Sequence, residues 1–287
     1  MTTTGTTTGT TAGSTAFVLG GGGVLGAVEV GMLRALTEAG VRPDLVLGTS
    51  VGAVNGAMIA RDPSIETIDR LVDMWSSSGA SEVYASGAVG QVVRAVRTRT
   101  HLHSSEPLRR RLLDELGHLD FEDLAVPFQC VAACIERSAE HWFTRGPVVP
   151  AILASAAVPG LFPPAEVDGE HFLDGGIVNS VPVGRAVELG ATTVHVLQVG
   201  RVERPLSPPS QPWEVARVSF EIARRHRFVR EVAAAPEGVR VHVLPTGETS
   251  AADDRLLAHR DFSVVARKID AAYAATAAYL ADLDADA

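Results

Sequence analysis

The sequence predicts a three-layer α/β/α fold with a mainly parallel central sheet. From residue 16 onward, short apolar runs alternate with longer helical segments, which is the pattern of parallel strands joined by covering helices. Glycine-rich turns follow the first two apolar runs, as expected where a strand passes into a helix. The 287 residues are 46% hydrophobic, which is enough material for a large buried core.

The first elements are regular. Strands are expected at 16–19 and 45–47, because each range is a short apolar run followed directly by glycine. The apolar, alanine-rich segments that follow predict helices at 24–39 and 50–60, and a further helix is expected at 65–77.

The middle of the chain is less regular. A polar, basic and weakly patterned stretch precedes Pro107 and is the candidate for a mobile lid or insertion. Beyond it, the polar turn "ERSAE" joins two expected strands, and the proline-rich "RPLSPPSQP" separates the last elements from the rest. The expected strands are 128–135, 141–144, 171–173, 193–199 and 239–244, and the expected helices are 148–156, 182–189, 213–232 and the alanine-rich end of the chain.

Composition and charge exclude several classes of protein. A net charge of −9 argues against a general nucleic-acid binder, which needs a basic surface. No Lys or Arg precedes Arg34 and no apolar run approaches the roughly 18 residues that span a bilayer, so we expect a cytoplasmic protein without signal peptide or anchor. Cys130 and Cys134 lie on one face of an expected strand, too far apart to bridge, and predict buried thiols rather than a metal site.

The motif "GTSVG" supplies a candidate nucleophile. Ser50 stands between small residues at an expected strand-to-helix turn, which projects a hydroxyl above the amino terminus of a helix. The α/β-hydrolase fold uses such a turn, but it sets several strands before its nucleophile, whereas two are expected here. His226, His242 and His259 share no motif, so no histidine base is indicated.

The earlier turn, "GGGGVLG", has a different role. Its G-x-G-x-x-G spacing satisfies part of the dinucleotide fingerprint, but the next strand ends in "LVLGTS" without the acidic residue that binds ribose. If both turns lie at the carboxyl ends of neighbouring parallel strands, the backbone N–H groups of 20–24 face the same crevice as Ser50. That arrangement makes an oxyanion hole.

Asp174 in "FLDGG" is the best candidate for a base. It ends an expected strand, and the two glycines after it let backbone approach closely. An isolated Asp-Gly pair is more often an ordinary turn. The presence of the other two motifs favours the catalytic interpretation.

With these motifs, the sequence resembles the patatin-like phospholipase family. "GGGGVLG", "GTSVG" and "DGG" occur in the order of the family's oxyanion loop, nucleophile elbow and aspartate motif. "ASAAVPGLFPP" looks like the family's small-residue helix and proline turn, and "SSEPLRRRL" looks like a helix start of the family. Leu25 departs from the basic residue usual after the glycines. The resemblance covers about 16–200 and implies a catalytic domain there. The composition of 1–15 predicts a disordered Thr/Gly-rich tail, and 201–287 are expected to form a C-terminal helical extension that packs on the core.

The resemblance also implies a mechanism. Ser50 would be the nucleophile and Asp174 the general base of a Ser–Asp dyad that hydrolyses lipid or other acyl esters without metal or cofactor. The residues implied for the oxyanion hole are Gly21, Gly22, Gly23 and Val24, and those that support the motifs are Gly26, Gly48, Gly52, Gly175 and Gly176. The alternative of another class is a non-catalytic module that keeps the fold and binds a lipid or nucleotide.

Basic charge is concentrated in two stretches of this acidic chain. Residues 94–111 contain six arginines and one glutamate, and residues 214–230 contain five arginines and two glutamates. Each is either a solvated helix face or a surface for peripheral contact with an anionic membrane. On the second interpretation, removing Arg94, Arg97 and Arg99 would weaken vesicle binding and spare a soluble ester.

Overall fold

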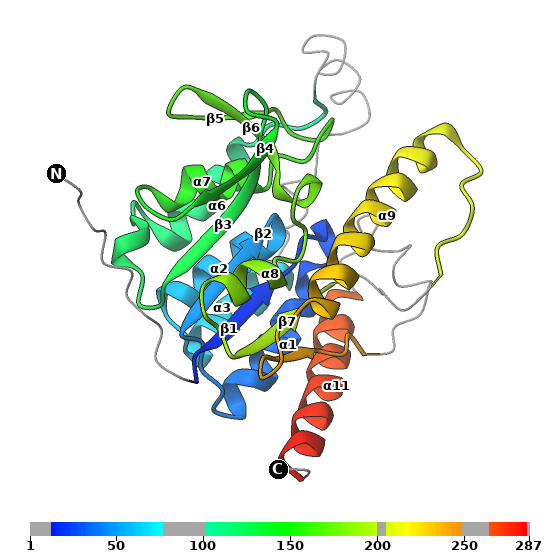
Figure 1. Cartoon of the computed structure of the whole chain (residues 1–287). Helices are drawn as coiled ribbons and strands as arrows, with labels where there is room; N and C mark the ends of the chain where they lie inside the picture. The colour runs from blue at the N-terminus through cyan, green and yellow to red at the C-terminus, as the bar shows by residue number, and fades with distance from the viewer. Residues whose placement is uncertain (1–12, 77–100, 200–204, 248–263, 286–287) are drawn as a thin grey trace, which may run out of the picture.

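The computed structural model describes residues 13–76, 101–199, 205–247 and 264–285 (Figure 1). Most of the expected Thr/Gly-rich tail and much of the expected lid, with Arg94, Arg97, Arg99 and also His259, lie outside the described residues. The strands are β1 (Thr15–Leu19), β2 (Leu45–Thr49), β3 (Phe128–Cys134), β4 (Ala139–Phe143), β5 (Ala165–Val167), β6 (Glu170–Asp174), β7 (Thr193–Leu197) and β8 (Arg240–Val243).

Eight α-helices and three short 3₁₀ turns connect these strands within the described ranges. The α-helices are α1 (Ala27–Glu38), α2 (Val51–Arg61), α3 (Ile65–Ser76), α6 (Glu106–Leu116), α7 (Val148–Ser155), α8 (Val183–Glu188), α9 (Pro212–Ala233) and α11 (Val265–Ala285). The 3₁₀ turns are η1 (Gly23–Gly26), η2 (Phe121–Asp123) and η3 (Gly175–Ile177).

The strands form one sheet with a parallel and an antiparallel part. Its order is β5-β6-β3-β2-β1-β7-β8, and β4 also pairs with β3. The run from β3 through β2, β1 and β7 to β8 is parallel, whereas β4 and β6 pair antiparallel with β3, and β5 pairs antiparallel with β6. The mainly parallel sheet predicted from the sequence is therefore confirmed.

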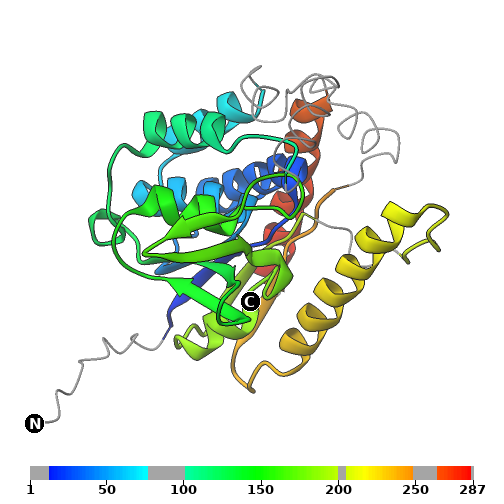
Figure 2. The same cartoon turned by 90° about the horizontal axis from the view of Figure 1, so that it is seen from above.

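Alternation along the central strand builds two hydrophobic cores. Phe17 and Leu19 of β1 belong to the core beneath α1, α2 and α3, whereas Ala16 and Val18 belong to the core on the other face. Figure 2 shows the helices on both sides of the strands, with α9 in yellow on one side and α1 to α3 in blue and cyan on the other. This is the predicted three-layer α/β/α arrangement.

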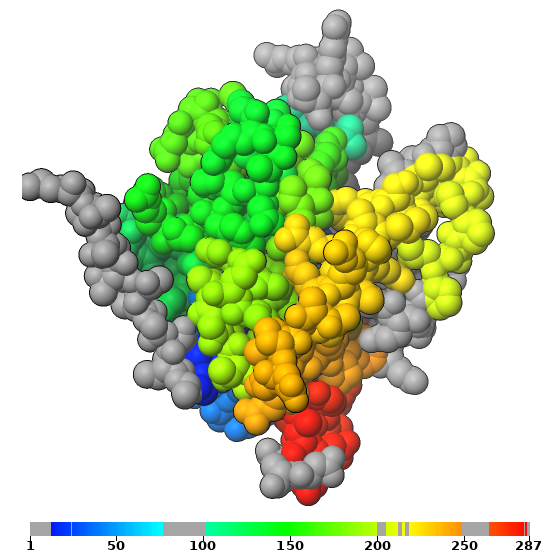
Figure 3. Space-filling view, viewed as in Figure 1, coloured from blue at the N-terminus to red at the C-terminus, as the bar shows by residue number. Residues whose placement is uncertain are grey.

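The last third of the chain completes the sheet and its covering layers. β8 pairs with β7, and α11 packs along α1. α9 contacts α8 and crosses the face shown in Figure 3, where Phe228 joins the core beneath it. Among the described residues, no helix is both long enough and apolar enough to cross a bilayer.

Two local features differ from the sequence-based expectation. The helix expected at 24–39 begins at Ala27, because the 3₁₀ turn η1 occupies Gly23–Gly26 and opens with Gly23 at a left-handed φ of 58°. The short strand β5 was not predicted. Asp168 and Gly169, both at positive φ, form the tight turn between β5 and β6, and an Asp-Gly pair is a strong hairpin signal.

Candidate active site

Ser50 occupies a strained turn between β2 and α2. Its φ of 55° and ψ of −120° are uncommon for a residue with a side chain, and such strain is concentrated at functional sites. The flanking glycines make the turn possible, because a Cβ on Gly48 would lie 2.5 Å from the Gly52 carbonyl oxygen, and one on Gly52 would lie 2.3 Å from that of Leu19. The sequence motif thus folds as a sharp elbow at the amino terminus of α2.

Ser50 and Asp174 meet in the structure. The Ser50 hydroxyl donates a hydrogen bond of 2.5 Å to Oδ2 of Asp174, and the two residues are 5% and 4% exposed. In the register of β3, Val131 pairs with both Thr49 and Trp142, and Ala132 pairs with both Asp174 and His141. β4 pairs with β3 along one edge, opposite both Val131 and Ala132. β2 and β6 therefore both pair along the other edge of β3, one after the other. Ser50 follows the end of β2 and Asp174 ends β6, so the two residues lie next to each other.

The environment of Asp174 makes it a stronger base than an exposed carboxylate. Burial raises the pKa of Asp174 from 3.8 to about 6, against the opposing effect of hydrogen bonds from Ser50 and Gly176. The Gly176 amide donates to Oδ1 at 2.7 Å, which leaves Oδ2 for the serine. A Cβ on Gly175 would lie 2.1 Å from the Val131 carbonyl oxygen, so this position of the aspartate motif excludes a side chain.

The glycine-rich loop between β1 and η1 runs beside the serine. The amides of Gly20 and Gly21 donate to the carbonyl oxygens of Leu197 and Ser180, each at 2.9 Å. A Cβ built on Gly21 would lie 3.4 Å from Cβ of Ser50, which shows how closely the loop passes.

The remaining loop residues lie farther along the same turn. Gly22 and Gly23 carry amides that donate to no acceptor in the described part of the chain, and Gly23 lines the pocket that contains Ser50. Val24 follows within η1. Gly26 faces Val51 and Trp75, where a Cβ would lie 2.2 and 2.7 Å from their side chains.

An apolar pocket of about 80 Å³ opens beside Ser50. Its walls come from helices α2, α3 and α6, from Gly23 and from the turn after α7. The larger side chains that line it are Val54, Met74, Trp75, Leu108, Val158 and Phe162, with Arg111 at the same pocket. The apolar walls suit a hydrocarbon chain that enters next to Ser50.

Three buried polar side chains support the site and were not predicted. The Ser155 hydroxyl accepts a hydrogen bond of 2.9 Å from the Ser50 amide, which ties α7 to the elbow. Asn55 donates to the Gly26 carbonyl oxygen at 3.0 Å and to the buried carboxyl of Glu29 at 2.7 Å. Burial raises the pKa of Glu29 well above its ordinary value. Only Ser155 lies in a stretch that had been singled out, "ASAAVPGLFPP".

A distant arginine also reaches the glycine loop. Arg224 of α9 donates from Nη1 to the Gly21 carbonyl oxygen at 2.9 Å, across 203 positions of sequence. The sequence predicts a solvated or membrane-facing surface for this basic stretch of α9, yet Arg224 is 7% exposed. Of the described histidines considered earlier, His226 is exposed on α9, and His242 contacts the Tyr279 hydroxyl.

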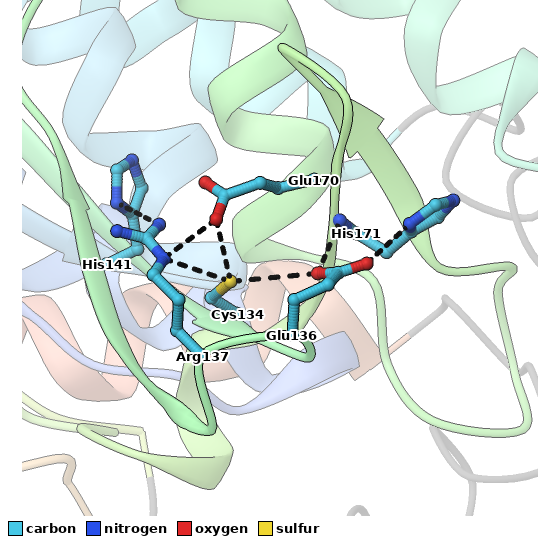
Figure 4. Close-up of polar contacts among 6 residues, drawn as sticks. All are labelled: Cys134, Glu136, Arg137, His141, Glu170 and His171. Carbon is cyan, nitrogen blue, oxygen red and sulfur yellow. Dashed lines mark hydrogen bonds and ion pairs between the residues drawn. The ribbon is translucent and has the colours of Figure 1, made fainter.

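A polar cluster holds the other end of the strand that carries Asp174 (Figure 4). Glu136, after β3, accepts a 3.0 Å hydrogen bond from the His171 amide and lies 2.7 Å from His171 Nδ1. Hydrogen bonds from the backbone and side chain of His171 lower the pKa of Glu136 to about 2. Arg137 pairs with Glu170 at 2.9 Å and donates to the sulfur of Cys134 at 3.2 Å. Cys130 and Cys134 are free and buried, as predicted.

Comparison with known proteins places these motifs in a family. Residues 17–187, more than half of the chain, match the family described as "Patatin-like phospholipase". The chain is 32% identical over 190 residues to "Lysophospholipase nte1" of Aspergillus terreus and 31% identical over 185 residues to "Neuropathy target esterase sws" of Drosophila melanogaster. These matches cover 65% and 64% of this chain but 12% and 13% of the relatives.

Two further similarities complete the comparison. "Patatin-like phospholipase domain-containing protein 7" of Rattus norvegicus is 32% identical over 187 residues, which is 64% of this chain and 13% of that protein. The crystal structure of VipD from Legionella pneumophila aligns with a TM-score of 0.49 at 14% identity, covering 94% of this chain and 67% of that one. The family match spans the glycine loop, the elbow and the aspartate motif. The chain belongs to the patatin-like phospholipase family.

Proposed function

We propose that this protein is a serine acyl hydrolase that cleaves carboxylic ester bonds of lipids through a Ser50–Asp174 dyad. The observation that carries the proposal is the 2.5 Å hydrogen bond between the Ser50 hydroxyl and Asp174, inside a buried site. Nucleophilic catalysis by serine needs an adjacent base within hydrogen-bond reach, and Asp174 meets this condition. The names of the relatives, a lysophospholipase and an esterase, support the same class of reaction.

In the first half of the reaction, Ser50 attacks the ester. Asp174 takes the hydroxyl proton while the serine oxygen bonds to the carbonyl carbon, and the carbonyl oxygen becomes negatively charged. When the tetrahedral intermediate collapses, the bond to the leaving alcohol breaks, and that alcohol takes the proton from Asp174. In the second half, water attacks the acyl-enzyme, again giving a proton to Asp174, which returns it to Ser50 as the carboxylic acid leaves.

Backbone amides of the glycine loop are the proposed oxyanion donors. The Gly21 amide is engaged by the Ser180 carbonyl, so the donors that we propose are those of Gly22 and Gly23, with Val24 next in the turn. The amino terminus of α2 lies directly behind Ser50, and its dipole favours negative charge at this place. Such donors stabilise the charge that develops in the transition state.

The apolar pocket beside Ser50 is the proposed site of the acyl chain. Its lining of aromatic and aliphatic side chains offers burial to a hydrocarbon and few partners to a polar group. This favours a lipid ester over a polar acyl donor as the substrate.

Labelling with a fluorophosphonate tests the proposal against the alternative of a binding module. Wild-type protein should be labelled at Ser50 and should release fatty acid from a panel of lysophospholipids, phospholipids and short soluble esters. Ser50→Ala should do neither, whereas Ser14→Ala, which changes a buried serine just before β1, at the end of that strand opposite to the glycine loop, should still be labelled. A folded wild-type protein that reacts with neither the probe nor any ester would contradict the proposal.

A further inference from the structure

The glycine loop is clamped from a part of the chain outside the family match. The match ends at residue 187, whereas Arg224 donates to the Gly21 carbonyl oxygen from the middle of α9. At the other end of the loop, Asn55 of α2 donates to the Gly26 carbonyl oxygen. Side chains thus hold a backbone carbonyl near each end of the turn.

The buried guanidinium of Arg224 is held mainly by its contact with the glycine loop. Burying a cation is costly unless it is paired or hydrogen-bonded, and the Arg224 side chain is 5% exposed. Its shortest contact is the 2.9 Å bond to Gly21, whereas Glu221 lies 3.4 Å from Nη2 and Nε has no partner among the described residues. The position of the guanidinium therefore depends chiefly on the loop.

Holding the Gly21 carbonyl also orients the next amide. The described chain contains no cis peptide bond, so the Gly21 carbonyl and the Gly22 N–H lie in one plane and point in opposite directions. A carbonyl fixed toward α9 therefore leaves the Gly22 N–H directed away from α9. Glycine rotates easily about its backbone bonds, so without the clamp this peptide plane would be free to turn over.

We propose that Arg224 is a positioning residue for the oxyanion hole: it fixes the Gly21–Gly22 peptide so that the Gly22 amide is available to the transition state. This inference rests on the proposed function, because it assigns the arginine to the same reaction. It makes α9 part of the catalytic apparatus without contact between Arg224 and the substrate.

Replacement of Arg224 by methionine tests the inference, because methionine keeps an unbranched stem and removes the donors. With a short soluble ester, Arg224→Met should lower kcat on the order of tenfold to 100-fold and change KM by less than about twofold, since the loss falls on the transition state. Arg225→Met is the matched control. Arg225 is the next residue of the same helix and lies 3.5 Å from the same Glu221. Because the bond to the Gly21 carbonyl comes from Arg224, loss of the Arg225 guanidinium should leave kcat within about twofold.

Chemical rescue separates positioning from simple docking of α9. In Arg224→Ala, millimolar ethylguanidinium should restore part of kcat by filling the vacated site, and it should not raise the activity of wild type or Arg225→Ala. If Arg224→Met does not fold, Arg224→Lys takes its place: a single ammonium donor should give a kcat between wild type and the alanine variant.

The outcomes are distinct for the two proposals. A folded Arg224→Met with a kcat like that of Arg225→Met would overturn the inference while leaving the dyad intact. In a second outcome, the activity falls only in proportion to the folded fraction and does not respond to ethylguanidinium. That outcome would contradict the positioning role and show that Arg224 only holds α9 against the core. Absence of labelling and hydrolysis in wild type would instead remove the proposed function itself.

Discussion

The titration of Asp174 should control the rate of the proposed reaction. As a general base it must be ionised, and its pKa of about 6 means that kcat/KM for a soluble ester should rise with pH and level off above about 7. At about pH 5, roughly one tenth of the molecules carry the ionised base, so the rate should be about tenfold below the plateau. An exposed carboxylate would have completed its titration below this range.

Burial of the Asp174 carboxylate also lowers the free energy of unfolding at neutral pH. The pKa is raised in the folded state above its ordinary value of 3.8, so between about pH 4 and 6 the folded protein binds more protons than the unfolded chain. This contribution to stability is therefore present at low pH and is lost as pH rises through about 6. A rise from 3.8 to about 6, at about 1.4 kcal/mol for each pKa unit, corresponds to about 3 kcal/mol.

Asp174→Asn measures that cost, because asparagine has a similar shape and no charge. From about pH 4 to pH 7, the free energy of unfolding of the variant should improve relative to wild type by about 2 kcal/mol, which is most of that cost, as followed by urea unfolding. Asp73→Asn, at an exposed position on α3, is the matched control for the change of one carboxylate to an amide. A rate profile that is flat from about pH 5 to 8, together with a pH-independent stability difference, would refute the assignment of Asp174 as a buried base.

Three further predictions concern the site. Ser50→Ala and Asp174→Ala should each abolish most turnover, and the double variant should be scarcely worse than either, because the residues act as one unit; additive losses in kcat would contradict the dyad. Gly22→Val should lower kcat about 100-fold in a folded protein, since a Cβ there lies 1.7 Å from a Val199 methyl and forces the loop to move; an unchanged kcat would exclude this amide. Val54→Trp should fill the apolar pocket and lower kcat/KM for long-chain esters at least tenfold relative to acetyl esters, and equal losses for both would show that the chain binds elsewhere.

The residues of the proposed dyad could be singled out from the sequence because each lies in a short motif with its own turn chemistry. Ser50 needs glycines on both sides, and Asp174 is followed by two, so the local sequence carries the signal. Their meeting was inferred from the family resemblance. The structural reason for it, the shared edge of β3, depends on a register between segments about 40 and 80 positions apart, which a single sequence does not encode locally.

The supporting contacts were less predictable. Arg224 stands in a run of arginines with the pattern of a solvated helix face, and nothing in the local sequence distinguishes it from Arg225. Only the packing of α9 on the sheet decides which arginine is buried against the glycine loop. The antiparallel pairing of β5 and β6 was missed for a different reason, since β5 has three residues and its Asp-Gly turn was the sole signal.

The end-to-end placement of β2 and β6 along β3 determines which sequence changes the site can tolerate. Main-chain hydrogen bonds set the distance between Ser50 and Asp174, so strand residues other than Gly48 can be exchanged for residues of similar size and polarity while the ladder persists. Gain or loss of one residue within β3 or β6 would instead shift a strand by about 3.3 Å and turn its side chains to the opposite face. We therefore expect the candidate site to accept substitutions of similar volume in its strands and almost no insertions or deletions.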